Sequence, residues 1–109
     1  MSVNKVILVG NVGQDPDVKE IGNGNKVAKF SLATTDRYKK DGEPVEQTEW
    51  HNVEAWGKLA EIVENYVKKG KQVYLEGKLK TESWEEDGVK KFKTKVVAAN
   101  IQLLGKKDD

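Results

Sequence analysis

The fold is decided within residues 48–70, which read TEWHNVEAWGKLAEIVENYVKKG. Up to Trp56 the side chains alternate, with a tryptophan or a polar residue at the even positions from Trp50 on, as in a β-strand with one buried face. From Lys58 onward the apolar residues fall at helical spacing, at Leu59, Ile62, Val63, Tyr66 and Val67. Two lysines and Gly70 then supply the cations and the glycine that commonly end a helix. This stretch therefore predicts a strand followed by one amphipathic helix of about three turns.

Further strands are predicted on both sides of this stretch. Val3 to Val9 is interpreted as a largely buried first strand, and the residues after the Gly22–Asn25 turn alternate as a second strand to about Thr35. After the helix, residues 73–80 alternate as a fourth strand, residues 85–88 form a turn, and residues 89–104 form a fifth. The segment 37–47 is polar and has no period, which predicts a long mobile loop.

This order predicts an all-β protein in which five short antiparallel strands close into an OB-fold barrel, with one α-helix between strands 3 and 4. The chain has 109 residues, which is enough for one domain with a single core. We therefore assign residues 1–105 to one OB-fold domain and residues 106–109 to a short, charged, disordered C-terminal tail.

Composition excludes several kinds of chemistry. The chain has no cysteine and a single histidine, His51, so disulfides, thiolate nucleophiles and cysteine-ligated metal sites are ruled out. We find no carboxylate-rich cation loop, no nucleophile with a partnered base, and no phosphate-cradling loop of P-loop type. The sequence thus predicts a protein that is not an enzyme and has no cofactor and no metal. His51 is interpreted as a structural residue, in the core or in a subunit contact.

The hydrophobic run near the N-terminus is short. Val6 to Val9 is too brief for a signal peptide or a membrane span, so we expect a cytoplasmic protein that does not associate with a membrane. Nor is the net charge informative, because 19 Lys and Arg against 18 Asp and Glu give only +1. Lysines gather at 68–80 and 90–95 and acids at 43–49 and 82–87, clusters that by themselves are typical of an ordinary solvated surface.

The aromatic residues are more informative than the charges. Tyr38 lies at the start of the polar segment, Trp50 and Trp56 lie on the hydrophilic face of the third strand, and Trp84 precedes an acidic turn. Rings placed in this way are either covered in a subunit interface or presented to a ligand. The interleaved lysines favour a flat, negatively charged ligand, of which single-stranded nucleic acid is the commonest. For Trp56, core packing beside the helix start is a competing interpretation.

Four blocks of the sequence resemble a known family: NKVILVGNVGQDP at 4–16, EQTEWH at 46–51, GKLAE at 57–61 and KGKQVYLEG at 69–77. In this order they are similar to the conserved blocks of the bacterial single-stranded DNA-binding proteins, and the match runs from about Val3 to Leu104. The resemblance implies an OB-fold homotetramer. It also implies sequence-nonspecific binding of single-stranded DNA, which protects that DNA during replication, recombination and repair.

The resemblance also implies roles for individual residues. Bases are expected to stack on four rings, those of Tyr38, Trp50, Trp56 and Trp84. Phosphates are expected near four lysines, Lys5, Lys58, Lys69 and Lys80. Subunit contacts are expected at His51, Gln72 and Tyr74.

The chain departs from the family pattern in two respects. Asn52, Glu82 and Ser83 stand where better-known members carry basic residues, which predicts weaker binding or a different response to salt, offset in part by the larger ring of Trp56. The sequence also ends at Asp109 without the family's usual glycine- or glutamine-rich tail and acidic tip, so recruitment of replication and repair proteins through such a tail is not expected.

A second class of function is an accessory module. An OB-fold relative that serves a primosome-like assembly would keep the barrel, contact partner proteins and bind DNA weakly. The aromatic set favours the first interpretation, because a module that only contacts proteins has no need of four rings at DNA-facing positions.

Overall fold

A computed structural model describes residues 1–105. The elements are β1 (Val6–Val12), β2 (Asp17–Glu20), β3 (Lys26–Lys40), β4 (Glu43–Trp56), α1 (Lys58–Tyr66), β5 (Gln72–Glu86) and β6 (Val89–Leu103). The charged tail predicted at residues 106–109 lies outside the described residues. Within residues 1–105, no helix is long and apolar enough to cross a bilayer.

Five of the six strands close into a ring. Strand β1 pairs antiparallel with β5 along most of its length and with β3 at Asn11 and Val12. Strands β3 and β4, and strands β5 and β6, form two long antiparallel hairpins, and a short contact between β4 and β6 completes the ring. The predicted all-β barrel with one helix is confirmed, because α1 lies between β4 and β5, which correspond to the predicted third and fourth strands.

The barrel differs from the prediction in three ways. The contact between β4 and β6, at Val53 opposite Val96, is parallel rather than antiparallel. The hairpin strands have 14 or 15 residues and are not short. A further strand, β2, pairs with the outer edge of β3 opposite residues 26–29. Its sequence, DVKE, is too short and too polar to show an alternating pattern.

The predicted mobile loop at residues 37–47 is wrong, because this segment forms the outer half of the β3–β4 hairpin. The ladder continues without a break to Lys40 opposite Glu43. Asp41 and Gly42 form the turn with φ values of 54° and 79°, the left-handed conformation that tight hairpins require. The Asp-Gly pair is itself a strong hairpin signal, and the polar residues beside it are those of a ribbon with two solvated faces.

The end of the helix and the start of β1 also differ from the prediction. Helix α1 ends at Tyr66, because Val67 adopts an extended backbone and is buried with 1% exposure. Gly70 therefore does not cap the helix but lies in the following turn, where its N–H donates to the carbonyl of Val12 at 2.7 Å. Strand β1 begins at Val6, and its outer face is exposed rather than largely buried.

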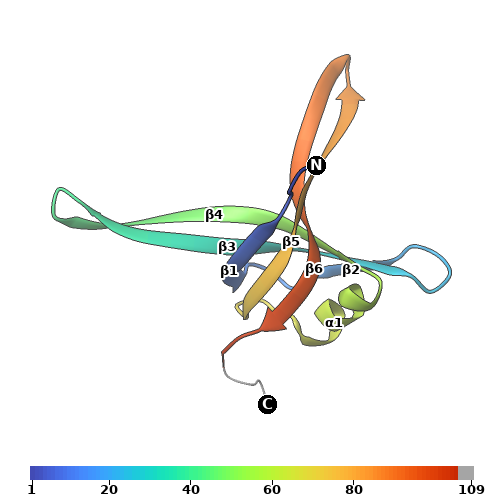
Figure 1. The fold of residues 1–109 in the computed structure, drawn as a ribbon, viewed down its shortest axis with the longest axis horizontal. Helices are drawn as coiled ribbons and strands as arrows, with labels where there is room; N and C mark the ends of the chain where they lie inside the picture. Colours follow the sequence, from blue (N-terminus) through green and yellow to red (C-terminus); the bar gives the residue numbers. More distant parts are fainter. Residues whose placement is uncertain (106–109) are drawn as a thin grey trace.

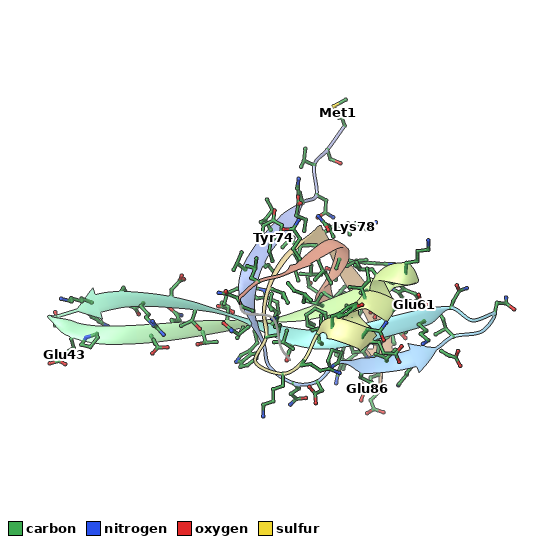
Figure 2. All side chains as sticks on the ribbon, turned by 90° about the horizontal axis from the view of Figure 1, so that it is seen from below. Met1, Glu43, Glu61, Tyr74, Lys78 and Glu86 are labelled. Carbon is green, nitrogen blue, oxygen red and sulfur yellow. The ribbon has the colours of Figure 1, made fainter. Side chains whose placement is uncertain are left out.

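The hydrophobic core fills the barrel and continues beneath the helix. The largest fully buried side chains come from β3, β4, α1, β5 and the residue after α1: Leu32, Val53, Val63, Val67, Val73 and Leu75. Figure 1 shows α1 beside the barrel, and the outer parts of the β3–β4 and β5–β6 hairpins projecting from it in different directions. In Figure 2, Glu43 marks the far end of the β3–β4 hairpin, well away from the crowded side chains of the barrel.

Candidate nucleic-acid interface

The strand register places the three tryptophans on one continuous face. Residues 50, 52, 54 and 56 of β4 point to the same side of the sheet, because successive side chains alternate. On the neighbouring hairpin, Trp84 lies opposite Lys91 and Lys80 lies opposite Lys95. The ammonium of Lys95 joins the two hairpins by donating to the Oε2 of Glu54 at 2.8 Å. The face therefore runs from β4 across β6 to β5.

The aromatic rings on this face are open to solvent. Trp50 is 60% exposed, Trp56 is 47% exposed and Trp84 is 43% exposed. The competing interpretation, that Trp56 fills the core beside the helix, is therefore wrong. Exposed rings of this size are available to stack on flat ligands.

Tyr38 is not brought together with the tryptophans. It is 46% exposed but lies opposite Val45 in the outer half of the β3–β4 hairpin. By the alternation of the strand it shares a side with Leu32 and not with Trp50, whose partner on β3 is Ala33. A ligand that contacts both Tyr38 and Trp50 has to pass around the hairpin.

The Trp50 ring packs against the backbone at Gly13. A Cβ atom built at Gly13 would lie 2.4 Å from Cζ3 and 3.0 Å from Cη2 of Trp50, and 2.8 Å from the Oγ of Ser31. The bare glycine therefore lets the ring lie directly on the backbone. The sequence pattern predicts no contact between Gly13 and Trp50, because the two residues are 37 positions apart.

A groove of about 260 Å³ lies on this face between the two hairpins. Its lining includes Ser31, Asn52, Glu54, Glu82, Lys93 and Lys95. Lys95 forms ion pairs with both Glu54 and Glu82. Burial lowers the pKa of Lys95, but its hydrogen bonds to the two carboxylates outweigh that effect and raise the pKa above its ordinary value. The hydrogen bond between Lys95 and Glu82 lowers the pKa of Glu82.

The four predicted phosphate-binding lysines do not form one cluster. Lys80 lies on the same face as Trp84, whereas Lys58 begins α1 and Lys69 lies in the turn after it. These three side chains are exposed. Lys5 is held by Glu76, with 2.9 Å between Nζ and Oε1, and this hydrogen bond raises the pKa of Lys5. Lys5 is therefore already paired with a carboxylate.

Lys91, Lys93 and Lys95 were missed as individual site residues. They alternate along β6, lie opposite the β5 positions 84, 82 and 80, and so share the face of Trp84. The signal was present in the sequence, because lysines at every second position of a strand point to the same side.

The predicted subunit-contact residues lie on two parts of the barrel. His51 is half-buried, and its Nε2 lies 2.9 Å from the Oγ1 of Thr34. Gln72 and Tyr74 alternate with the buried Val73 on β5 and therefore point outward. Tyr74 lies opposite Val9 of β1, which is 46% exposed. The outer side of β1 and β5 thus exposes the apolar Val9 and Tyr74 beside the polar Gln72.

A closed barrel that carries exposed tryptophans and lysines on one face is an oligonucleotide-binding module by architecture. The single-strand binding protein family matches residues 3–104 of this chain. Single-stranded DNA-binding protein 1 of Chlorobaculum tepidum is 48% identical over 109 residues, which cover 97% of this chain and 67% of that protein. The chain belongs to the single-strand binding protein family, and the resemblance drawn from the four sequence blocks is confirmed.

Two solved structures share this fold closely. A Plasmodium falciparum SSB in complex with ssDNA has a TM-score of 0.86 and is 31% identical, covering 96% of this chain and 97% of that one. A deletion mutant of the single-stranded DNA-binding protein from Thermus aquaticus has a TM-score of 0.81 and is 31% identical, covering 94% of this chain and 51% of that one. The similarity therefore extends over nearly all of this chain in three dimensions.

Proposed function

We propose that this protein binds single-stranded DNA without sequence preference and protects it during DNA replication, recombination and repair in the cytoplasm. The observation that carries the proposal is the continuous face on which Trp50, Trp56 and Trp84 are exposed among lysines. Membership of the single-strand binding protein family supports it. Residues 1–105 are the domain to which we assign this activity.

Binding proceeds through two kinds of contact that do not read base identity. Every base has a π-face, so stacking on the exposed rings tolerates any sequence and contributes ~1–3 kcal/mol per base. Lysines neutralise phosphates and release counterions, which makes the affinity depend on salt. We assign three exposed lysines to phosphate contacts: Lys58, Lys69 and Lys80. We assign Tyr38, on the far side of its hairpin, as a fourth ring on which a base stacks.

Two carboxylates on the proposed binding face reduce its electrostatic attraction for the phosphates of DNA. Glu54 and Glu82 both engage Lys95, so this cation is already neutralised before DNA arrives. We therefore expect affinity for oligo-dT to fall with salt along a modest slope. The same feature supports the weaker or different salt response expected from Glu82.

We further propose that the protein is a homotetramer whose subunits meet through His51, Gln72 and Tyr74. The apolar side chains exposed beside Tyr74 support this, since Ile7 is 56% exposed and Val9 is 46% exposed on the neighbouring strand. Replacing His51 by a bulky residue is expected to dissociate the assembly before it unfolds the subunit. Light scattering at micromolar concentration tests this, and a monomeric wild-type protein would contradict it.

The decisive experiment is a titration with oligo-dT and with duplex DNA at two salt concentrations. All three tryptophans lie on the proposed binding face, so poly-dT is expected to quench most of the intrinsic fluorescence while duplex DNA has little effect. Lys90→Ala serves as a matched control and should bind like the wild type, because Lys90 lies opposite Glu85 and therefore on the other side of the β5–β6 hairpin from Trp84. Indifference to single strands would instead favour the accessory-module interpretation.

A further inference from the structure

Glu54 is the one fully buried charged residue among residues 1–105, with 4% of its surface exposed. A carboxylate out of water is costly unless its oxygens are hydrogen-bonded or paired. Both oxygens of Glu54 are engaged. Oε1 accepts from the indole Nε1–H of Trp56 at 2.6 Å, and Oε2 accepts from the Nζ of Lys95 at 2.8 Å.

The two partners of Glu54 belong to the binding face and not to the core. The Trp56 ring is 47% exposed although its indole N–H is hydrogen-bonded to Glu54. The Lys95 side chain is 12% exposed and also pairs with Glu82, which lines the same groove. Replacing a buried ion pair by apolar residues of similar size often leaves the stability of a protein unchanged. We therefore look for a role of the Glu54 carboxylate other than stabilising the fold.

We propose that Glu54 is a positioning residue for DNA binding, which fixes the Trp56 ring in its stacking orientation through the indole hydrogen bond. This inference rests on the proposed function. A tryptophan side chain has two free torsions, and a hydrogen bond at the edge of the ring restrains both while leaving one face open. A ring held in place before binding loses less conformational entropy when a base stacks on it. The second oxygen, bonded to Lys95, keeps the carboxylate from turning away.

The test compares Glu54→Leu with Glu54→Gln. Both changes remove the same negative charge from the groove, but only glutamine keeps a carbonyl oxygen that can accept from the indole N–H. If Glu54 positions Trp56, loss of the charge favours binding in both variants, but Glu54→Leu binds oligo-dT about twofold to tenfold more weakly than Glu54→Gln, the range of a single hydrogen bond. If only charge matters, both variants bind more tightly and to the same degree. Equal affinities for the two variants would overturn the proposal.

Glu82→Gln is the matched control. It removes a carboxylate from the same lysine but does not touch Trp56. Loss of this negative charge beside the DNA path is expected to strengthen binding, as in Glu54→Gln, whereas Glu54→Leu is expected to bind about twofold to tenfold more weakly than both. A Glu54→Leu variant that behaves like Glu82→Gln would also overturn the proposal.

Two further measurements keep the inference separate from folding and from the proposed function. In a Trp56→Ala background, Glu54→Leu and Glu54→Gln should bind with equal affinity, because the ring that Glu54 positions is gone. If Glu54→Leu does not fold, Trp56→Phe is compared with Trp50→Phe. The first removes the ring that bonds to Glu54 and must cost about twofold more in affinity than the second, or the proposal fails. A wild-type protein that ignores oligo-dT refutes the proposed function itself.

Discussion

Gly13→Ala is expected to weaken DNA binding without direct contact with DNA, because Trp50 rests on this glycine. The new methyl carbon would lie 2.4 Å from the nearest ring carbon, whereas carbon atoms in contact are about 3.5–4.0 Å apart. The ring therefore has to tilt or retreat by about 1 Å. The backbone itself permits alanine, since Gly13 is not among the residues with positive φ.

The size of the effect follows from the stacking energy. A gap of 0.5–1 Å forfeits about a quarter to a half of the dispersion well, and a base stack contributes ~1–3 kcal/mol. The loss is then about 0.3–1.5 kcal/mol, or roughly twofold to tenfold in Kd. The methyl group would also lie 2.8 Å from the Oγ of Ser31, so the affinity is compared per folded molecule.

The assay is the anisotropy of labelled oligo-dT at fixed low salt, with thermal unfolding measured in parallel. Trp50→Ala sets the upper bound of the loss, and adding Gly13→Ala to it should change the affinity no further. If Gly13→Ala melts normally and binds with the affinity of the wild type, the contact between Gly13 and the Trp50 ring has no part in binding.

Three further predictions concern the other parts of the surface. Trp56→Ala should cost ~1–3 kcal/mol of oligo-dT binding and leave the melting temperature nearly unchanged, because the ring is 47% exposed; a large fall in melting temperature with normal affinity would contradict this. Lys80→Ala should lower the salt slope of binding by roughly 0.7, as expected for one phosphate of a single strand, and an unchanged slope would identify Lys80 as ordinary surface charge. The hydrogen bond from Lys5 lowers the pKa of Glu76, so their pairing stabilises the fold above the ordinary glutamate pKa of about 4.3 and is lost as the pH falls through the lowered value. Melting of Glu76→Gln should therefore depend less on pH in this acidic range than melting of the wild type.

The barrel was predictable because its signals are local. The alternation around Val53, the helical spacing from Leu59 and the turn at Asp87-Gly88 each depend on neighbours in the sequence. The parallel contact at Val53 and Val96 was not predictable, since it joins residues 43 positions apart and is fixed only when the barrel closes. The β3–β4 hairpin was misjudged because solvated ribbons lack the apolar pattern on which strand prediction depends.

The candidate site was predictable in its parts but not in its connections. The exposed tryptophans followed from their polar surroundings on the strand. The indole hydrogen bond to Glu54, the contact of Gly13 with Trp50 and the pairing of Lys95 across the groove depend on side-chain placement in three dimensions. The sequence also does not show that Tyr38 lies on the other side of its hairpin, because the polar segment around it has no strand alternation.

The two projecting hairpins have a consequence for how DNA leaves the protein. Beyond Ala33 on β3 and beyond Gly77 on β5, each ribbon is paired almost entirely with its own partner strand. Two-stranded ribbons are only marginally stable alone, so their outer amides should exchange with solvent faster than those of the barrel. A DNA strand held by both ribbons and the barrel is thus held by parts that loosen independently. We therefore expect DNA that contacts both ribbons and the barrel to dissociate in steps rather than all at once.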